Sequence, residues 1–321
     1  MTTRTVTTLG PAAVLAAAER IAGRVRRTPL LTIGALPGVL LKAEHLQRSG
    51  SFKARGATNA MLAHGAERVV TGSSGNHGLA VAALGAALGA HVTVVMAAGA
   101  SQAKAAAIRQ LGADVVPVAG GVADRERHAR EHARRTGATL VPSADDELIV
   151  AGQGTVALEV FADAPDVDAI YVPTGGGGLL AGSCLAAGTL DRRIRVIGVE
   201  PATARRYATS LAADRPVELP PPDTIADGLR GQRPGEVPFP IIRDRVDAMI
   251  GVTDEAITRA MGLLNRWGVP AEPSGSVALA GALESGFHGR VAVIVSGGNT
   301  PAALARASRS TTPSIPRGRT P

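Results

Sequence analysis

Seven short apolar runs, each followed by Gly or Ser and then by an Ala-rich stretch, organise most of the chain. They are VLLKAE, RVVTGS, HVTVVM, DVVPVA, AIYVPT, RVIGVE and VAVIVS. Strand-like runs that alternate with helical stretches are typical of stacked βαβ units. The runs are apolar throughout rather than alternating, as expected for parallel strands covered by helices on both faces. The sequence therefore predicts an α/β fold with a doubly wound, mostly parallel sheet.

A compact series of strands and helices lies between residues 68 and 145. We predict that it forms a second, smaller α/β domain, and that residues 1–67 and 146–307 together form the large domain. The Pro- and Gly-rich segment 218–240 is expected to be a long ordered loop beside a functional site. Residues 308–321 have the composition of a disordered tail.

Charge, hydropathy and cysteine content argue against several classes of protein. The net charge is +7, but the arginines are scattered and aromatic residues are only 2% of the chain, so we expect no nucleic-acid partner. No apolar run approaches the roughly 20 residues that span a bilayer, and the first residues lack a signal-peptide pattern. We therefore expect a cytoplasmic protein without a membrane partner. Cys184 is the only cysteine, which excludes an internal disulfide and suggests a buried, inert thiol.

Three Gly-rich turns stand between a strand and a helix. They are TGSSGNHG (71–78), PTGGGGLLAG (173–182) and VSGGNT (295–300). Each can bind an anion, because glycine lets the backbone approach closely and the following helix presents unpaired N–H groups at its positive end. Four consecutive glycines, Gly175, Gly176, Gly177 and Gly178, are the strongest candidate for a phosphate site.

The same turn also supports a different chemistry. Gly176, Gly178 and Ala181 match the dinucleotide fingerprint G-x-G-x-x-A after a strand. Glu200 ends the next strand, close to where a ribose-binding acid would lie. A nicotinamide enzyme is therefore an alternative at this stage.

Lysine usage favours a Schiff-base enzyme. Arginine cannot form an imine, and the chain has three lysines: Lys42, Lys53 and Lys104. We expect Lys42 and Lys104 to be solvated surface residues. Lys53 follows Phe52 at the start of a helix, where the helix dipole lowers the pKa of an amine and the aromatic ring helps to desolvate it. An ordinary first-turn lysine is the simpler alternative for Lys53 taken alone.

The chain resembles the fold-type II pyridoxal-phosphate family, specifically its serine and threonine dehydratases and serine racemases. The resemblance covers nearly the whole chain, in order. The motifs are RRTPLL (26–31), LKAEHLQRSGSFKARGA (41–57), SSGNHG (73–78), AGQGT (151–155), GGGGLLAG (175–182), VEP (199–201), TIADGL (224–229), EPSGS (272–276) and SGGN (296–299).

The resemblance implies pyridoxal 5'-phosphate as the cofactor and assigns residues to it. Lys53 is the lysine that holds the cofactor, with Phe52 beside the ring. The phosphate lies in the turn from Gly175 to Leu179. Asn76 contacts the phenolic oxygen, and Ser296 meets the pyridine nitrogen. A neutral hydroxyl there makes the cofactor a weaker electron sink than a carboxylate would, which favours β-elimination.

The resemblance also assigns residues to the substrate. Its carboxylate is expected against Ser73, Asn76 and His77 at a helix N-terminus, with Arg125 as a further contact that has a solvated arginine as its alternative. Ser74 occupies the position where serine racemases carry a serine on the face of the cofactor opposite the lysine. Ser74 could therefore transfer a proton on the face opposite Lys53, so that protons move on both faces of the cofactor. The alternative is that its hydroxyl only stabilises the turn.

We predict no metal site. Related enzymes bind a divalent cation through the glutamate of a VEP turn, a backbone carbonyl four residues on and an acid two further, which here are Glu200, Ala204 and Arg206. An arginine removes one ligand and adds a competing charge. We expect Arg206 or Arg205 to pair with Glu200 instead, with solvated arginines as the alternative.

The resulting hypothesis is a homodimeric, pyridoxal-phosphate-dependent threonine or serine dehydratase, an ammonia-lyase that converts a 3-hydroxy amino acid into a 2-oxo acid and ammonium. The alternatives are a serine racemase and a dehydratase for 3-hydroxyaspartate or phenylserine.

Overall fold

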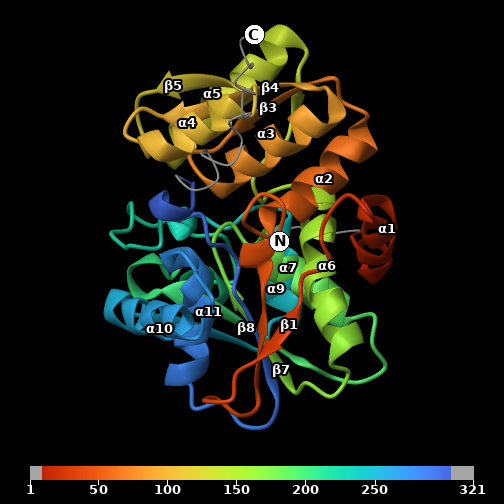
Figure 1. Cartoon of the computed structure of the whole chain (residues 1–321), viewed down its shortest axis with the longest axis vertical. Helices are drawn as coiled ribbons and strands as arrows, with labels where there is room; N and C mark the ends of the chain where they lie inside the picture. Colours follow the sequence, from red (N-terminus) through yellow and green to blue (C-terminus); the bar gives the residue numbers. More distant parts are fainter. Residues whose placement is uncertain (1–8, 305–321) are drawn as a thin grey trace, which may run out of the picture.

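Two separate sheets organise the computed structural model, which describes residues 9–304 (Figure 1). The larger sheet has six strands in the order β1-β2-β10-β7-β8-β9. All its pairs are parallel except β1 with β2. Its strands are β1 (Leu30–Thr32), β2 (Val39–Lys42), β10 (Val291–Ile294), β7 (Ala169–Pro173), β8 (Arg195–Pro201) and β9 (Ala248–Val252).

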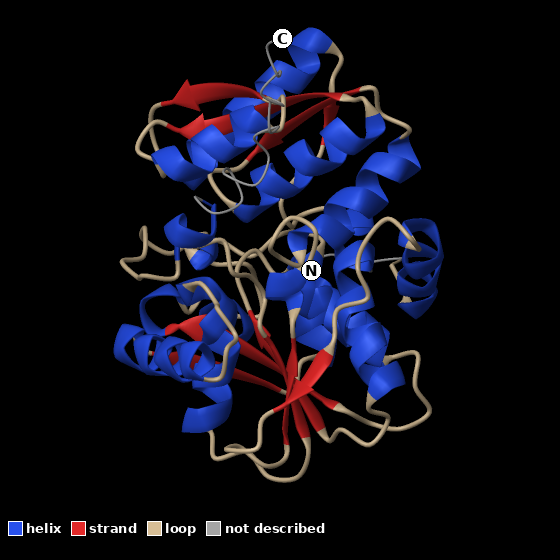
Figure 2. Cartoon of the chain, viewed as in Figure 1, coloured by secondary structure: helices blue, strands red, loops and turns tan. Residues whose placement is uncertain are grey.

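The smaller sheet has four parallel strands in the order β5-β4-β3-β6. These are β3 (Arg68–Gly72), β4 (His91–Ala97), β5 (Asp114–Val118) and β6 (Thr139–Leu140). Figure 2 shows the two groups of strands well apart, with helices and loops between them. The predicted α/β class with parallel sheets is confirmed. The division at residues 68 and 145 remains a prediction, although all four strands of the smaller sheet lie inside it.

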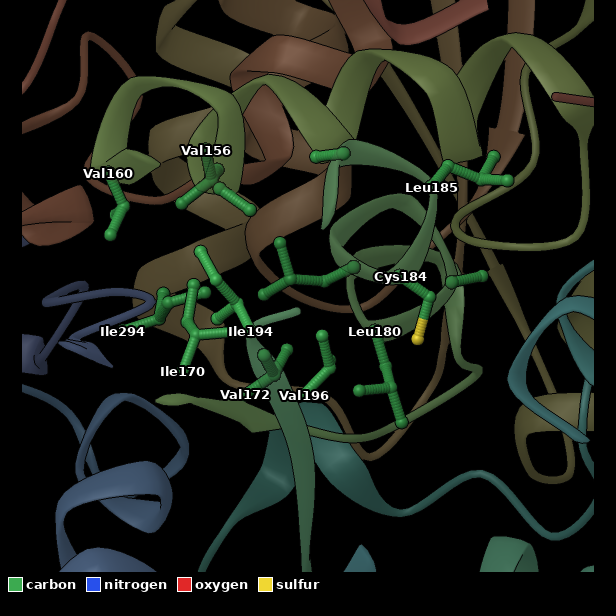
Figure 3. Packing of buried hydrophobic residues seen from close by; sticks show 14 of the residues in the cluster. Val156, Val160, Ile170, Val172, Leu180, Cys184, Leu185, Ile194, Val196 and Ile294 are labelled. Carbon is green, nitrogen blue, oxygen red and sulfur yellow. The ribbon is translucent and has the colours of Figure 1, made fainter. Parts of the chain in front are cut away.

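Helices cover both faces of the large sheet because alternate strand residues point to opposite sides. Ile170 and Val196 pack with helices α1, α6, α7 and α9, and Tyr171 and Ile197 pack with α10 and α11. Figure 3 shows the first layer, in which Val156 of α6 and Leu180 of α7 face the strands. The helices are α1 (Pro11–Ile21), α6 (Glu147–Asp163), α7 (Gly178–Ala187), α8 (Arg206–Ala212), α9 (Pro238–Arg245), α10 (Asp254–Arg266) and α11 (Pro273–Glu284).

The helices around the small sheet are α2 (Lys53–His64), α3 (Asn76–Leu88), α4 (Gln102–Gln110) and α5 (Val122–Thr136). Val69 and Val94 pack with α2, α3 and α4, whereas Val70 and Val95 pack with Ala129 of α5 on the other face. Three short 3-10 helices complete the elements: η1 (Glu44–Leu46), η2 (Ala202–Ala204) and η3 (Asp227–Leu229).

Close packing of α6 on α7 explains the AGQGT motif. A Cβ on Gly154 would lie 2.6 Å from the carbonyl oxygen of Gly182, and one on Gly182 would lie 2.5 Å from the backbone nitrogen of Gly154. Any side chain at either position would therefore push the two helices apart.

Cys184 of α7 is buried in this layer, and burial raises the pKa of its thiol to about 12, as an inert thiol requires (Figure 3). Between residues 9 and 304, no helix is long and apolar enough to cross a membrane. The predicted disordered tail, 308–321, lies outside the described residues.

Candidate active site

Lys53 is held against the SGGN turn by backbone hydrogen bonds. The N–H of Phe52 donates to the carbonyl oxygen of Ser296 at 3.0 Å, and the N–H of Gly298 donates to that of Gly50 at 3.0 Å. The loop before α2 and the turn after β10 thus form one unit, although they are more than 240 residues apart. This unit places Lys53 close to Ser296, and both are residues that the family resemblance assigns to the cofactor.

The Lys53 amine is buried beside a backbone carbonyl group and an aromatic ring, with charges of both signs, Arg125 and Glu126, close enough to act on it. Its Nζ donates to the carbonyl oxygen of Ser143 at 2.5 Å and lies 5.0 Å from the centre of the Phe52 ring. Burial lowers the pKa of Lys53 to about 8, and the Arg125 guanidinium contributes further. A larger fraction of this amine is neutral near pH 7 than in an exposed lysine, which makes it a competent nucleophile and base.

A buried charge cluster anchors the helix that carries Lys53. Arg55, fully buried on α2, donates to Glu44 of η1 at 2.7 Å and to Glu159 of α6 at 2.7 Å. Lys42 joins the cluster, with its Nζ 2.6 Å from Glu159 Oε2 and 0% exposed. The prediction that Lys42 is a solvated lysine is therefore wrong. Its strand, β2, is an interior strand, and its acidic partner lies 117 residues away.

The tetraglycine turn presents free donors at the start of α7. Among the described residues, the backbone N–H groups of Gly176, Gly177, Gly178 and Leu179 reach no backbone acceptor. Gly177 has φ +97°. A Cβ on Gly176 would lie 2.7 Å from Cβ of Ala144, which follows the Ser143 that binds Lys53. Unpaired N–H groups at a helix N-terminus fit a phosphate, so the turn fits the phosphorylated cofactor.

Asn76 begins α3 and faces the SGGN turn. Its Oδ1 accepts a hydrogen bond from Asn299 Nδ2 at 2.9 Å, and its Nδ2 donates to Glu272. Burial raises the pKa of Glu272 to about 7, although the Lys104 charge opposes the shift. Sequence reasoning gave Glu272 no role, and its only signal was its place in the EPSGS motif.

Ser73 and Ser74 shape the loop that precedes Asn76. The Oγ of Ser73, which is buried, accepts from the N–H of Gly75 at 3.3 Å. The Oγ of Ser74 accepts from the N–H of Ala97 at the end of β4 at 3.0 Å. Each hydroxyl therefore has a structural contact, and each retains a hydrogen to donate.

His77 and Arg125 lie near Lys53 without ion-pair partners among the described residues. His77 Nε2 is 3.0 Å from the carbonyl oxygen of Val141, and burial together with the Lys53 charge lowers its pKa to about 3. His77 is therefore neutral. Arg125 has a buried Nε with no hydrogen-bond partner. An unpaired guanidinium beside the lysine is suited to bind a substrate carboxylate.

Lys104 is not the solvated residue that the sequence predicted. Its side chain is 8% exposed, and its Nζ lies 2.6 Å from Asp227 Oδ2 of η3. A Cβ on Gly75 would lie 3.7 Å from the same Nζ. The alanine-rich helix pattern of α4 carries no sign of this partner, which is 123 residues away. Asp227, in the TIADGL motif, is a second residue that sequence reasoning left without a role.

Glu200 makes no ion pair with Arg205 or Arg206 within the described chain, so the predicted pairing is wrong. Its carboxylate accepts from the N–H groups of Tyr207 at 2.9 Å and Ala208 at 3.1 Å. Arg206 is fully buried and binds carbonyl oxygens instead, so the solvated alternative also fails for this residue. Glu200 is also only 1% exposed, so its carboxylate is out of reach of a ribose, which argues against the nicotinamide alternative.

Comparison with known proteins agrees with this geometry. Residues 21–297 match the family of pyridoxal-phosphate dependent enzymes. The chain is 38% identical over 301 residues to a serine racemase of Oryza sativa subsp. indica, covering 88% of each protein. It is 40% identical over 299 residues to an L-threo-3-hydroxyaspartate ammonia-lyase of Pseudomonas sp, covering 89% of this chain and 94% of that one.

The solved structure of a threonine deaminase from T.th. is also similar, with a TM-score of 0.86, 42% identity, and 90% of this chain and 98% of that chain covered. The chain belongs to the pyridoxal-phosphate dependent enzymes of fold type II, and its cofactor is pyridoxal 5'-phosphate. Its relatives are ammonia-lyases and racemases of small amino acids.

Proposed function

We propose that this chain is an ammonia-lyase that eliminates water from a small 3-hydroxy amino acid, threonine or serine, and releases a 2-oxo acid and ammonium. The observation that carries the proposal is the position of Lys53. It has a depressed pKa and lies between the tetraglycine turn, through Ser143 and Ala144, and the SGGN turn, through Phe52.

Pyridoxal phosphate, when bound, supplies the electron sink that makes the α-proton of an amino acid acidic. Lys53 would hold the cofactor, and its free amine would be the base that takes the α-proton of the substrate. Arg125 and the N-terminal end of α3 bind the substrate carboxylate. Neutral His77 leaves the positive charge there to Arg125 and to the backbone donors.

Asn76 and Ser296 would bind polar atoms of the cofactor ring. Asn76 is fixed by Asn299 and Glu272, and Ser296 lies in the turn that binds Phe52. The cofactor assignments to Phe52, Asn76, Gly175 to Leu179 and Ser296, and the substrate assignments to Ser73, Asn76, His77 and Arg125, form part of this proposal.

Serine racemase is the second candidate, and Ser74 is the observation that favours it. A serine hydroxyl there could return a proton to the face opposite Lys53. The hydrogen bond that Ser74 Oγ accepts from Ala97 fixes the hydroxyl but leaves its hydrogen free to donate, so this contact does not separate the two activities.

A direct assay separates the candidates. The purified enzyme is incubated with L-serine, L-threonine, L-threo-3-hydroxyaspartate and phenylserine, and oxo acid, ammonium and the chirality of the remaining amino acid are measured. The proposal predicts equal amounts of oxo acid and ammonium from threonine or serine. Inversion without ammonium would identify a racemase, and release of oxo acid from hydroxyaspartate or phenylserine alone would reassign the substrate. Light scattering tests the expected homodimer.

A further inference from the structure

The first two side chains of α8 donate hydrogen bonds to backbone carbonyl oxygens of the tetraglycine turn. Arg206 Nη1 donates to the carbonyl oxygens of Thr174 at 3.3 Å and Gly175 at 2.7 Å, and the Tyr207 hydroxyl donates to that of Gly176 at 2.8 Å. Three successive carbonyl groups are therefore held toward α8. Arg206 Nη2 donates to the carbonyl oxygen of Leu229, so the same side chain also fixes the last residue of η3.

Holding these carbonyls fixes the direction of the neighbouring N–H groups. A peptide unit is planar and trans, so its N–H points away from its C=O. The N–H groups of Gly175, Gly176 and Gly177 must then point away from α8. They lead into the free N–H groups of Gly178 and Leu179 at the start of α7. The donors that fit a phosphate are thus oriented by contacts made on the opposite side of the turn.

Tyr207 fits the turn so closely that only glycine is tolerated opposite it. A Cβ on Gly177 would overlap the Tyr207 hydroxyl oxygen and would lie 2.5 Å from Cζ of the same ring and 2.9 Å from Cβ of Pro238. Gly177 also has φ +97°, which L side chains rarely adopt. The shape of the turn and the position of Tyr207 therefore depend on each other.

Arg206 carries a buried charge that no neighbouring acid neutralises directly. The residue is 0% exposed, its Nε has no partner, and among the described residues no carboxylate lies within ion-pair distance of its guanidinium. Glu200, the acid whose charge reaches it, is occupied by the N–H groups of Tyr207 and Ala208. A buried cation bound only to neutral carbonyls is costly. An anion on the far side of the turn would offset that cost.

We propose that Arg206 and Tyr207 are positioning residues for the cofactor phosphate, Tyr207 through the orientation of the turn and Arg206 through both that orientation and its charge. Neither residue touches the phosphate, because the turn lies between them and it. The inference concerns the phosphate alone, so it does not depend on which amino acid is the substrate or on whether elimination or racemisation follows.

Pyridoxal phosphate and pyridoxal, which lacks the phosphate, separate this role from a merely structural one. Both are titrated into the cofactor-free 321-residue chain and into the variants Tyr207→Phe, Arg206→Lys and Arg206→Gln, with affinity followed by absorbance. Arg205→Gln, which alters an exposed neighbouring arginine, is the matched control.

We expect Tyr207→Phe to lower the affinity for pyridoxal phosphate about fivefold, the effect of one hydrogen bond. Arg206→Gln should lower this affinity more than about tenfold, and Arg206→Lys should have an intermediate effect. Pyridoxal affinity should stay within about twofold throughout, and Arg205→Gln should change neither affinity. If Arg206→Gln fails to fold, Tyr207→Phe and Arg206→Lys carry the test. Equal losses for both ligands, or no loss for pyridoxal phosphate in Tyr207→Phe and Arg206→Lys, would overturn the proposal.

Discussion

Lys104 Nζ and Asp227 Oδ2 lie 2.6 Å apart and join the two halves of the molecule. Lys104 belongs to α4 beside the small sheet, and Asp227 to η3 among the loops of the large one. Asp227 is in turn held by the hydroxyl of Ser274 on α11 at 3.3 Å. The ion pair therefore links α4, whose Lys104 amine lies near Gly75, to η3 and α11 beside the large sheet.

Replacing Asp227 with Asn should weaken substrate binding more than turnover. It removes the charged partner of a lysine that is only 8% exposed, and a charge-assisted hydrogen bond of this kind contributes about 1.5 kcal/mol. We expect KM for the best substrate to rise about tenfold with a smaller fall in kcat. Asp223→Asn, in the same loop, is the control. An unchanged KM in Asp227→Asn would show that the pair does not organise the site.

Replacing Ser74 with Ala should reduce racemisation more than elimination. Racemisation requires a proton donor on the face opposite Lys53, whereas elimination does not. Loss of the hydrogen bond from Ala97 should affect both activities to a similar, small extent. The ratio of product enantiomer to oxo acid therefore carries the test, and an unchanged ratio would make Ser74 a purely structural residue.

Glu272 should make stability fall as pH rises toward neutrality. Burial raises its pKa from 4.5 to about 7, so between these values the folded state binds the proton that the unfolded state has lost. At about 1.4 kcal/mol per pKa unit, the free energy of unfolding falls by on the order of 3 kcal/mol by pH 8. His77 acts in the opposite direction, because its folded pKa of about 3 favours folding as pH rises to 6.5.

Comparing the unfolding free energies of variants isolates the contribution of Glu272 to the pH dependence of stability. Unfolding free energies of the cofactor-free wild type, Glu272→Gln and the exposed control Glu67→Gln are measured from about pH 5 to 8, the range in which a carboxyl with this pKa titrates. The difference between Glu272→Gln and wild type should grow in favour of the variant with pH. A constant difference across this range would contradict a buried, titrating Glu272.

Divalent cations should have little effect on this enzyme. Arg206 occupies the position of an acidic ligand, and the described residues include no cluster of three or more metal-binding side chains. We expect EDTA, Mg²⁺ and Ca²⁺ to change activity by less than about twofold, since the guanidinium repels a cation. A large activation that EDTA reverses would mean that an ion binds despite Arg206.

The sequence predicts the fold class correctly because that class depends on local patterns. Each apolar run or glycine turn is a pattern of a few neighbouring residues, and such patterns place Lys53 at the start of a helix and Gly175 to Gly178 between a strand and a helix, as the structure shows. The misassigned residues depend on distant partners. Lys42 is buried by Glu159, and Lys104 by Asp227, each more than 100 residues away.

Arg206 illustrates a different limit. Its charge argued against a metal site, but its hydrogen bonds go to backbone carbonyls, which every residue possesses and no sequence pattern reveals. The strand β9 was also absent from the predicted runs, because its sequence AMIGV is short and only partly buried.

Chemical labelling of the lysine tests most directly whether Lys53 carries the cofactor. The purified enzyme is reduced with borohydride, digested and examined by mass spectrometry, with Lys53→Ala treated in parallel. We expect a visible absorbance band that disappears on reduction, with the cofactor mass on the peptide containing Lys53. Lys53→Ala should keep its fold but lose the label and the turnover. A label on Lys42 or Lys104, or undiminished turnover in Lys53→Ala, would show that Lys53 does not carry the cofactor.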